Sequence, residues 1–481
     1  MQYQSTRGSS PAVNSAQAVL LGIAGDGGLY LPEEIPAFDW QACVASDTIT
    51  MAKKILSAFL PDIPDMDALV EKAYRGKFET EELTPTVKVG DMTVLELFRG
   101  PTSAFKDVAL SMLPQLMTAA KDTCGDGKDI MILTATSGDT GKAALVGFRD
   151  VPGIRICVFY PDGGVSQVQR RQMVSQEGEN VRVCAIRGNF DDAQTGVKEI
   201  FAACQGKELP FRLSSANSIN IGRLVPQITY YFKAYRDLLD RKEIQLGQEV
   251  NFCVPTGNFG DILAGYLAKK LGLPVGKLLC ASNANDVLTE FLATGKYSRL
   301  RPFYKTLSPS MDILVSSNLE RLLYLESGDA QLVAQLMQQL KEQGYYQIPE
   351  NLHKAISENF WGHCATDEQG QQTIGKVWQD HRYLCDPHTA TAWLAAENYR
   401  TETGDSRPMV VLSTASPYKF PAAVLAAIGG DCSGDEFTQM ERLNGITGVP
   451  VPKNLAGLRT LPERHTGVIG KEEMLAYVLS L

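Results

Sequence analysis

Short, almost continuously apolar runs alternate with helical patterns along most of the chain. The runs are rich in branched side chains, and they occupy residues 130–134, 154–159, 181–186, 250–254 and 409–412. Strands of this kind, separated by helices, are typical of parallel sheets that are covered on both faces. The pattern therefore predicts an α/β fold with parallel sheets covered by helices.

Two stretches depart from this alternation. Residues 1–90 combine a glycine-rich turn with two helical stretches, which predicts a separate N-terminal domain. Residues 327–380 are polar and helical with amphipathic spacing, and we interpret them as a helical excursion on the sheet scaffold. A plain surface pair of helices without a catalytic role is the favoured interpretation of that excursion. The catalytic region is predicted to extend over 91–430, and a C-terminal segment, 431–481, follows it.

The composition limits the classes of function. At 481 residues the chain is longer than one hydrophobic core usually supports, so two or three domains are expected. A formal net charge of −9 argues against nucleic-acid or anionic-membrane partners, because these need clustered Lys and Arg. No apolar stretch is long enough to span a bilayer, and the start lacks the apolar run of a secretory signal. Ten scattered cysteines without a CxxC pair indicate a reduced, cytoplasmic protein, and five histidines without metal-ligand spacing predict no metal site.

Lys106 is the strongest candidate for a catalytic residue. It lies in the segment GPTSAFKD, residues 100–107, directly after an extended stretch. A lysine amine becomes a useful nucleophile when desolvation or nearby positive charge lowers its pKa. Phe105, Ala104 and a helix-like continuation offer an apolar setting of that kind. Taken alone the signal is weak, because most lysines beside an aromatic residue are solvated.

A glycine turn follows the predicted strand at 250–254 and leads into a helix. Backbone that approaches closely, together with the positive end of a helix dipole, favours a phosphate. The turn is neither GxGxxG nor GxxxxGK[ST], which disfavours a dinucleotide or a nucleoside triphosphate. The candidate phosphate-binding residues are Gly257, Asn258, Phe259 and Gly260.

A second turn follows the strand at 130–134, and its hydroxyl groups and glycines would suit a carboxylate. Its candidate residues are Ser137, Gly138, Asp139 and Thr140. Ser137 or Asp139 could instead serve only as the cap of the next helix.

A third cluster places amide, hydroxyl and guanidinium groups within seven residues, at Asn217, Ser218 and Arg223. Arg223 could hold a phosphate through two hydrogen bonds, although the cluster could also be an ordinary helix start. Thr414 ends another strand, and a neutral hydroxyl beside a pyridine nitrogen would leave that ring unprotonated. Together the four features fit pyridoxal 5′-phosphate, with Lys106 on its aldehyde, the glycine turn on its phosphate and a hydroxyl at its ring nitrogen.

These motifs occur together in a known family. From residue 3 to about residue 453 the chain resembles threonine synthases of the long type. Eight collinear motifs carry the resemblance: YQSTRG at 3–8, GDGGLYLP at 25–32, GPTSAFKD at 100–107, SGDTG at 137–141, NSINIGR at 217–223, GNFGD at 257–261, DPHT at 386–389 and TASPYKF at 414–420.

The resemblance implies the fold-type II pyridoxal-phosphate architecture, similar to the tryptophan synthase β chain, with a smaller mobile α/β subdomain near 125–215. It implies conversion of O-phospho-L-homoserine and water to L-threonine and phosphate, by a monomer or homodimer. By the family pattern, Lys106 binds the cofactor and moves protons, Asp139 approaches its 3-oxygen, and Thr414 meets its ring nitrogen. Ser137, Gly138 and Thr140 would hold the substrate carboxylate, and Asn217, Ser218 and Arg223 its phosphate.

One departure from the family pattern is Arg99, which stands where a histidine is usual. A cation there could lower the pKa of Lys106 or assist phosphate binding, and the sequence does not choose between these roles.

Three alternatives remain open at this point. A phospho-lyase of the same family would release 2-oxobutanoate and ammonia, and it would share Lys106 and the phosphate cluster. A dehydratase or β-replacing enzyme is disfavoured, because it does not need residues 217–223. A non-catalytic protein of this fold is disfavoured because it has no chemical need for Lys106.

Overall fold

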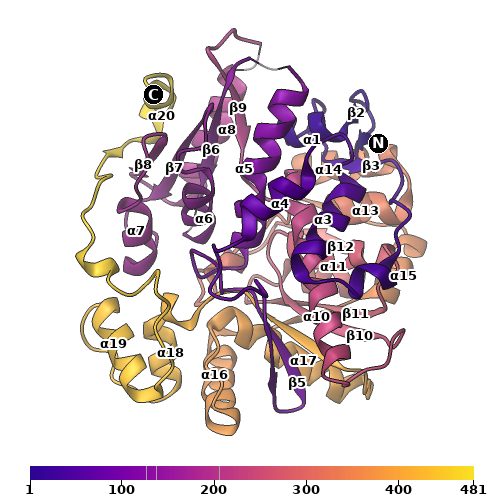
Figure 1. The fold of residues 1–481 in the computed structure, drawn as a ribbon, viewed down its shortest axis with the longest axis vertical. Helices are drawn as coiled ribbons and strands as arrows, with labels where there is room; N and C mark the ends of the chain where they lie inside the picture. The colour runs from indigo at the N-terminus through magenta and orange to yellow at the C-terminus, as the bar shows by residue number, and fades with distance from the viewer. Residues whose placement is uncertain (126, 137, 205) are drawn as a thin grey trace.

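The computed structural model describes residues 1–125, 127–136, 138–204 and 206–481, and two sheets form its scaffold (Figure 1). The larger sheet has six strands, and all its neighbouring strands are parallel except β4 and β5. Its spatial order is β14 (Phe360–Cys364), β11 (Val275–Ser282), β10 (Val250–Pro255), β15 (Met409–Ser413), β5 (Met92–Glu96) and β4 (Thr86–Val89).

The smaller sheet is parallel throughout and has five strands. Its order is β16 (Val468–Ile469), β8 (Val181–Ile186), β7 (Ile154–Pro161), β6 (Asp129–Ala135) and β9 (Phe211–Ser215). The edge strand β16 comes from the C-terminal segment, which runs from α19 (Glu436–Thr447) to α20 (Met474–Leu479) along one side of the molecule in Figure 1. The five apolar runs of the sequence thus lie in β6, β7, β8, β10 and β15, and the predicted α/β fold with parallel sheets is confirmed.

Helices cover both sheets. Apolar side chains of the smaller sheet pack on α8 and on the C-terminal α20, whereas its other face joins the main core of the molecule. In the larger sheet, α17 packs on β10, β11 and β15. The helices of these layers are α5 (Lys106–Thr123), α6 (Asp139–Phe148), α7 (Gln167–Val174), α8 (Phe190–Cys204), α9 (Ile221–Leu224), α10 (Ile228–Asp240), α11 (Gly260–Lys270), α12 (Val287–Thr294), α16 (Asp367–His381), α17 (Pro387–Thr403), α18 (Pro421–Ala427), α19 (Glu436–Thr447) and α20 (Met474–Leu479).

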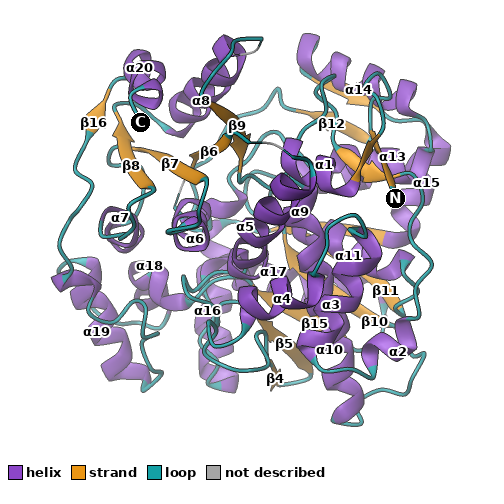
Figure 2. Cartoon of the chain, turned by 45° about the horizontal axis from the view of Figure 1, so that its top comes forward, coloured by secondary structure: helices purple, strands orange, loops and turns teal. Residues whose placement is uncertain are grey.

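The N-terminal residues pack directly on this scaffold (Figure 2). Strands β1 (Gln2–Ser5), β2 (Val13–Asn14) and β3 (Tyr30–Pro32) form a small antiparallel sheet, and helices α1 (Ser15–Leu21), α2 (Trp40–Val44), α3 (Thr48–Phe59) and α4 (Met66–Tyr74) complete the unit. Buried apolar side chains of this unit belong to the same core as those of α5 and α10. The N-terminal residues therefore support the helix that begins with Lys106.

The polar stretch 327–380 contains strands as well as helices. It follows α13 (Leu319–Ser327) and includes α14 (Ala330–Glu342), β13 (Tyr345–Gln347), α15 (Glu350–Asn359) and β14. Strand β13 pairs with β12 (Lys296–Ser298), and β14 pairs with β11 at the edge of the larger sheet. The stretch therefore contributes to the scaffold as well as covering it.

The ends of strands from both sheets meet at one place. Lys106 follows β5, Asp139 follows β6, and Lys419 follows β15, and ion pairs join the three side chains. In open parallel sheets, ligands bind beyond the carboxyl ends of the strands. Within the described ranges, no helix combines the length and apolarity needed to cross a bilayer.

Candidate active site

Lys106 is the first residue of α5, and a tightly held loop positions it. The carboxylate of Asp107 accepts hydrogen bonds from the backbone N–H of Thr102 (2.9 Å) and from its hydroxyl (2.5 Å). The N–H of Phe105 donates to the carbonyl of Thr414 (2.8 Å), which ties the loop to the end of β15. Ser103 has a φ of +58°, a strained value that the surrounding contacts maintain. The lysine side chain therefore enters the site from a fixed backbone.

The environment of Lys106 favours a neutral amine. The residue is 9% exposed, and its ammonium group lies 4.6 Å from the centre of the Phe105 ring. Burial lowers the pKa of Lys106 to about 8, and the positive charges of Lys419 and Arg223 act in the same direction, although Asp139 and Asp107 oppose them. A buried lysine with a pKa near neutral is the form that nucleophilic catalysis requires.

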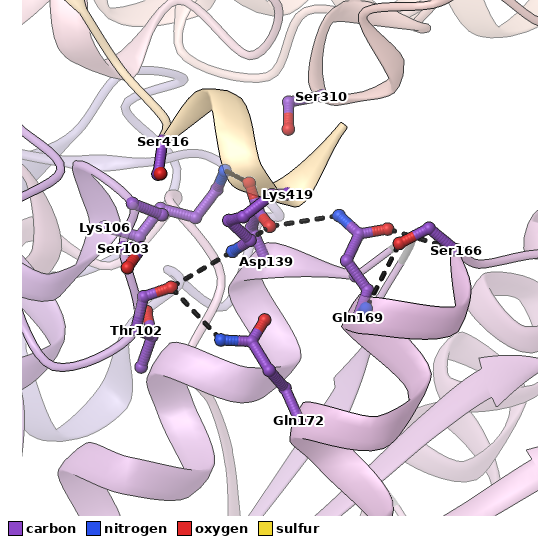
Figure 3. A network of polar contacts seen from close by, with 12 residues as sticks. Thr102, Ser103, Lys106, Asp139, Ser166, Gln169, Gln172, Ser310, Ser416 and Lys419 are labelled. Atoms are coloured by element: carbon purple, nitrogen blue, oxygen red, sulfur yellow. Dashed lines mark hydrogen bonds and ion pairs between the residues drawn. The ribbon is translucent and has the colours of Figure 1, made fainter. Parts of the chain in front are cut away.

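The carboxylate of Asp139 forms ion pairs with two lysines, one through each oxygen (Figure 3). One carboxylate oxygen is 2.5 Å from Nζ of Lys419 and accepts a hydrogen bond from Nε2 of Gln169 (3.0 Å). The other oxygen is 3.8 Å from Nζ of Lys106. Burial acts to raise the pKa of Asp139, but the two ammonium groups outweigh it and hold that pKa well below its usual range. Asp139 is therefore an ionised carboxylate inside the protein.

The turn before α6 places Asp139 in the helix rather than at its cap. The cap residue is Gly138, which has a φ of +139° and no side chain of its own to cap the helix. The hydroxyl of Thr136 accepts from the N–H groups of Gly138 and Gly141, at 2.9 Å each. Asp139 and Thr140 begin the helix, so a capping role for Asp139 is excluded. Ser137, the remaining residue predicted at this turn, lies outside the described residues.

The glycine turn at 257–260 begins α11. Phe259 stands at its N-terminus with a φ of +61°, and a helix start leaves its first N–H groups without partners in the helix. Gly257 is closely covered, since a Cβ there would lie 2.8 Å from the carbonyl oxygen of Ser310. The N–H of Asn318 donates to the carbonyl of Asn258 (3.0 Å), which holds the turn from the other side. This geometry suits a phosphate at the turn.

Arg223 is a buried cation without a paired carboxylate among the described residues. Its side chain is in α9, the residue is 3% exposed, and burial lowers the pKa of its guanidinium to about 10. One nitrogen donates to the carbonyl of Ala216, whereas buried Nε has no partner within the described part of the chain. Asn217 and Ser218 precede it on the turn after β9, and Asn318 contacts the Ser218 carbonyl (3.2 Å). The cluster is charged and unsatisfied, as expected of an anion-binding site.

Thr414 and Arg99, two further residues from the sequence analysis, each contact a neighbouring segment. Thr414 is buried just after β15, where its carbonyl receives the Phe105 N–H described above. Arg99 is bound by the carboxylates of Glu96 (2.6 Å) and Glu79 (3.2 Å). The cations with the largest effects on the pKa of Lys106 are Lys419 and Arg223.

Three groups in or near the site were not predicted as site residues. Lys419 and Gln169 bind Asp139, as described above. Asp261 in α11 accepts hydrogen bonds from the hydroxyls of Tyr230 (2.6 Å) and Tyr231 (2.9 Å), and burial raises its pKa to about 6. Lys419 has the same sequence signal as Lys106, a lysine beside a phenylalanine after an extended strand, and that signal could have identified it.

The buried carboxylate of Asp386, in the DPHT motif, caps α17 and accepts a hydrogen bond from Nδ1 of His388 (2.6 Å). Nε2 of His388 accepts the N–H of Ser310 (3.1 Å), so this motif supports the loop that covers Gly257.

The donor set fits pyridoxal phosphate. A buried amine with lowered pKa suits its aldehyde, and the α11 N-terminus suits its phosphate. The unpartnered Nε of Arg223 provides a second place for an anion. Within the described residues, no group of three or more His, Cys, Asp or Glu side chains could hold a metal ion.

The chain matches three family models in consecutive parts. They are "Threonine synthase N terminus" over residues 2–74, "Pyridoxal-phosphate dependent enzyme" over 80–415 and "Threonine synthase, C-terminal" over 389–477.

Individual relatives give the same result. The chain is 40% identical to the threonine synthase of Pseudomonas aeruginosa, over 97% of this chain and 98% of that protein. Its fold matches the crystal structure of pyridoxal-phosphate-bound threonine synthase from Brucella melitensis with a TM-score of 0.88 and 39% identity, covering 100% of this chain and 99% of that one. Threonine synthase-like 1 of Homo sapiens is 38% identical over 86% of this chain but only 58% of that protein. The expected fold-type II architecture is confirmed, and the chain belongs to the threonine synthase family of pyridoxal-phosphate-dependent enzymes.

Proposed function

We propose that this chain converts O-phospho-L-homoserine and water to L-threonine and inorganic phosphate, with pyridoxal 5′-phosphate as its cofactor. The observation that carries the proposal is the buried Lys106, whose pKa is lowered to about 8, in a site that also contains an unpaired Arg223. An amine for the cofactor and a cation for a phosphorylated substrate are the two requirements of this reaction. Family membership, established over the whole chain, supports the same activity.

The residues divide into a cofactor side and a substrate side. Gly257, Asn258, Phe259 and Gly260 would hold the cofactor phosphate through the start of α11. Thr414 would lie beside the ring nitrogen of the cofactor, and Asp139 would lie near its 3-oxygen. When bound, pyridoxal phosphate supplies an aldehyde and an electron-withdrawing ring that stabilises negative charge on substrate carbons.

Lys106 is the proposed catalytic acid and base. Its amine, neutral in an appreciable fraction of molecules near pH 8, can take a proton from a substrate carbon and return it to another. The fixed loop around Thr102 and Asp107 limits where Nζ can move, so the proton is delivered within a narrow volume.

Departure of phosphate needs positive charge that is free to interact with it. Negative charge builds on the leaving oxygens, and a preorganised cation in a site with little water stabilises that charge strongly. Arg223, with Asn217 and Ser218, would provide this interaction. Gly138 and Thr140, together with Ser137, would hold the substrate carboxylate at the start of α6.

The second candidate is a phospho-lyase that yields 2-oxobutanoate. It uses the same lysine and the same phosphate cluster, but relatives named threonine synthase match this chain over nearly their whole length, which favours the first candidate. The domain limits given above, a mobile subdomain near 125–215, a monomeric or homodimeric state and a cytoplasmic location remain part of the proposal.

One assay separates the candidates. The purified protein, loaded with cofactor, is incubated with O-phospho-L-homoserine while phosphate, threonine and 2-oxobutanoate are measured together. We expect one threonine for each phosphate and no product with Lys106→Ala. Equal amounts of phosphate and 2-oxobutanoate would identify the phospho-lyase, and absence of phosphate release would contradict both candidates.

A further inference from the structure

A second buried lysine stands in the site, and it contacts the carboxylate oxygen of Asp139 that does not face Lys106 (Figure 3). Lys419 ends the short 3-10 helix η3 (Pro417–Lys419), which follows β15, and its side chain is completely buried. Its Nζ lies 2.5 Å from Asp139 and donates to the carbonyl of Thr102 (3.2 Å). Two acceptors from different parts of the fold therefore fix this ammonium group.

The two lysines compete for one carboxylate. Lys419 is in direct contact with Asp139, whereas Lys106 is 3.8 Å away. Gln169 donates to the same oxygen that Lys419 contacts and so holds the carboxylate toward Lys419. The side chain of Gln169 is fixed in turn, since its Oε1 accepts the N–H of Ser166 in the capping box of α7. The fold thus assigns Asp139 to Lys419.

This division matters because a buried carboxylate with one ammonium neighbour would bind that neighbour strongly. Without Lys419, Asp139 would have Lys106 as its partner, and an ion pair of that kind keeps a lysine protonated. A protonated lysine has no lone pair and cannot attack an aldehyde.

We propose that Lys419 is a positioning residue that holds Asp139 as its own ion-pair partner and thereby leaves the Lys106 amine free to react. The proposal rests on the proposed role of Lys106 as the cofactor-binding amine. It assigns to the TASPYKF motif a task beyond the hydroxyl of Thr414. It also explains how the carboxylate of Asp139 can lie beside the Lys106 amine without keeping that amine protonated and unreactive.

Other charged groups lie around Lys106 and Lys419, and they stay unchanged in the variants of Lys419 and Asp139 described below. Asp107 follows Lys106 in α5, and three further groups come from neighbouring elements. These groups are Arg223 of α9, Asp261 of α11 and, beside Lys419, Lys142 of α6.

The test measures the reactivity of Lys106 directly and does not use turnover. Full-length protein freed of cofactor is mixed with pyridoxal 5′-phosphate for short times between pH 6.5 and 10.5. Borohydride then reduces the product of amine and aldehyde, which forms with loss of water. Peptide mass spectrometry gives the labelled fraction of Lys106, and hence the initial rate at each pH.

For the unchanged protein, the rate should rise with a midpoint near pH 8. For Lys419→Met, the midpoint should move up by at least about one pH unit, so the rate at pH 7 falls about tenfold while the rate at pH 10.5 is retained. Lys142→Met is the control, because Lys142 is a half-buried lysine near Lys419 whose Nζ donates to Gln176 (2.6 Å) and not to Asp139. Its midpoint should stay in place.

Two further variants keep the test decisive if Lys419→Met does not fold. In Asp139→Asn both ammonium groups remain and the carboxylate is removed, so the midpoint should fall below that of the unchanged protein. In the double variant with Lys419→Met, both partners are neutral, and the midpoint should return to or fall below the original one.

Some outcomes would overturn the proposal. An unshifted midpoint in Lys419→Met, or a rate reduced equally at every pH, would make Lys419 a structural residue only. An unshifted midpoint in Asp139→Asn would remove the basis of the argument. If the principal labelled site is a lysine other than Lys106, the proposed function fails together with this proposal, whereas labelling at Lys106 with unshifted midpoints refutes only the role of Lys419.

Discussion

Replacing Arg223 with methionine should abolish activity and at the same time stabilise the protein without ligands. Arg223 is 3% exposed, and its charge has no paired carboxylate among the described residues. Burial lowers the pKa of its guanidinium well below the usual range of arginine, to about 10. Because the group stays protonated at pH 7 in both the folded and unfolded chains, that difference is an energetic cost of folding.

The magnitude follows from the pKa difference of about 2.5 units. One unit corresponds to about 1.36 kcal/mol, so carrying the charge in the folded protein costs about 3 kcal/mol. Methionine keeps most of the apolar stem but loses the hydrogen bond to the Ala216 carbonyl, which is worth about 1 kcal/mol. The expected net gain in the free energy of unfolding is therefore about 2 kcal/mol. For a chain of this length that unfolds as one unit, such a gain raises Tm by about 2 °C.

Thermal unfolding of the cofactor-free protein measures this change, with and without inorganic phosphate. Arg149→Met is the matched control, since Arg149 is an exposed arginine paired with Asp150, and its replacement should change the free energy of unfolding by less than about 0.5 kcal/mol. Phosphate should raise the Tm of the unchanged protein more than that of Arg223→Met. A lower Tm for Arg223→Met would refute the reasoning, because it would mean that the buried charge is already compensated without a ligand.

Three further changes test other parts of the site. Gly257→Ala places a Cβ 2.8 Å from the Ser310 carbonyl oxygen, so the turn or the loop of Ser310 must move. The affinity for pyridoxal phosphate, measured by fluorescence titration, should fall about tenfold or more. An unchanged affinity would place the cofactor phosphate elsewhere. Asp261→Asn removes a buried carboxyl group whose pKa is raised to about 6. In the unchanged protein this group destabilises the fold as pH rises from about 4 through 6, because the unfolded chain releases its proton first. The Tm of the variant minus that of the unchanged protein should therefore increase over this range, and a flat difference would contradict a raised pKa. Asn454→Ala removes hydrogen bonds with the Ser103 hydroxyl (2.8 Å) and the Gly100 carbonyl (3.2 Å). The free energy of unfolding should fall by about 1 to 2 kcal/mol in thermal unfolding, and the affinity for the cofactor should weaken. An unchanged affinity would show that the C-terminal segment does not support the Lys106 loop.

The central strands could be predicted because a strand that is buried on both faces has an almost continuously apolar sequence. The runs at 130–134 and 250–254 became β6 and β10, with all or nearly all of their side chains buried. Strand β11 did not stand out, because Gly276 and Lys277 interrupt its apolar run. Strand β14 at the sheet edge is short and only partly buried, so it lacks the same pattern.

For the site, local sequence predicts which residue types are present but not how they pair. The apolar setting of Lys106 could be predicted from Phe105 and Ala104, which precede it in the chain. The contact between Asp139 and Lys419 joins residues that are 280 positions apart, and it depends on how the ends of β6 and β15 meet. No periodicity carries that information, so the partner of Asp139 is visible only in three dimensions.

The buried charges of the site are related to its proposed binding of phosphates. Lys106, Lys419 and Arg223 bring three basic groups to a region where Asp139 is the carboxylate in ion-pair contact with the two lysines. Asp107 and Asp261 also lie near the lysines, whereas Arg223 has no paired carboxylate among the described residues, so its desolvation opposes folding. Two phosphates, one on the cofactor and one on the substrate, would supply the missing negative charge. The stability that the protein gives up without ligands therefore becomes binding free energy when the phosphates enter. The lowered pKa of Lys106 results first from burial, and the charges of Lys419 and Arg223 act in the same direction.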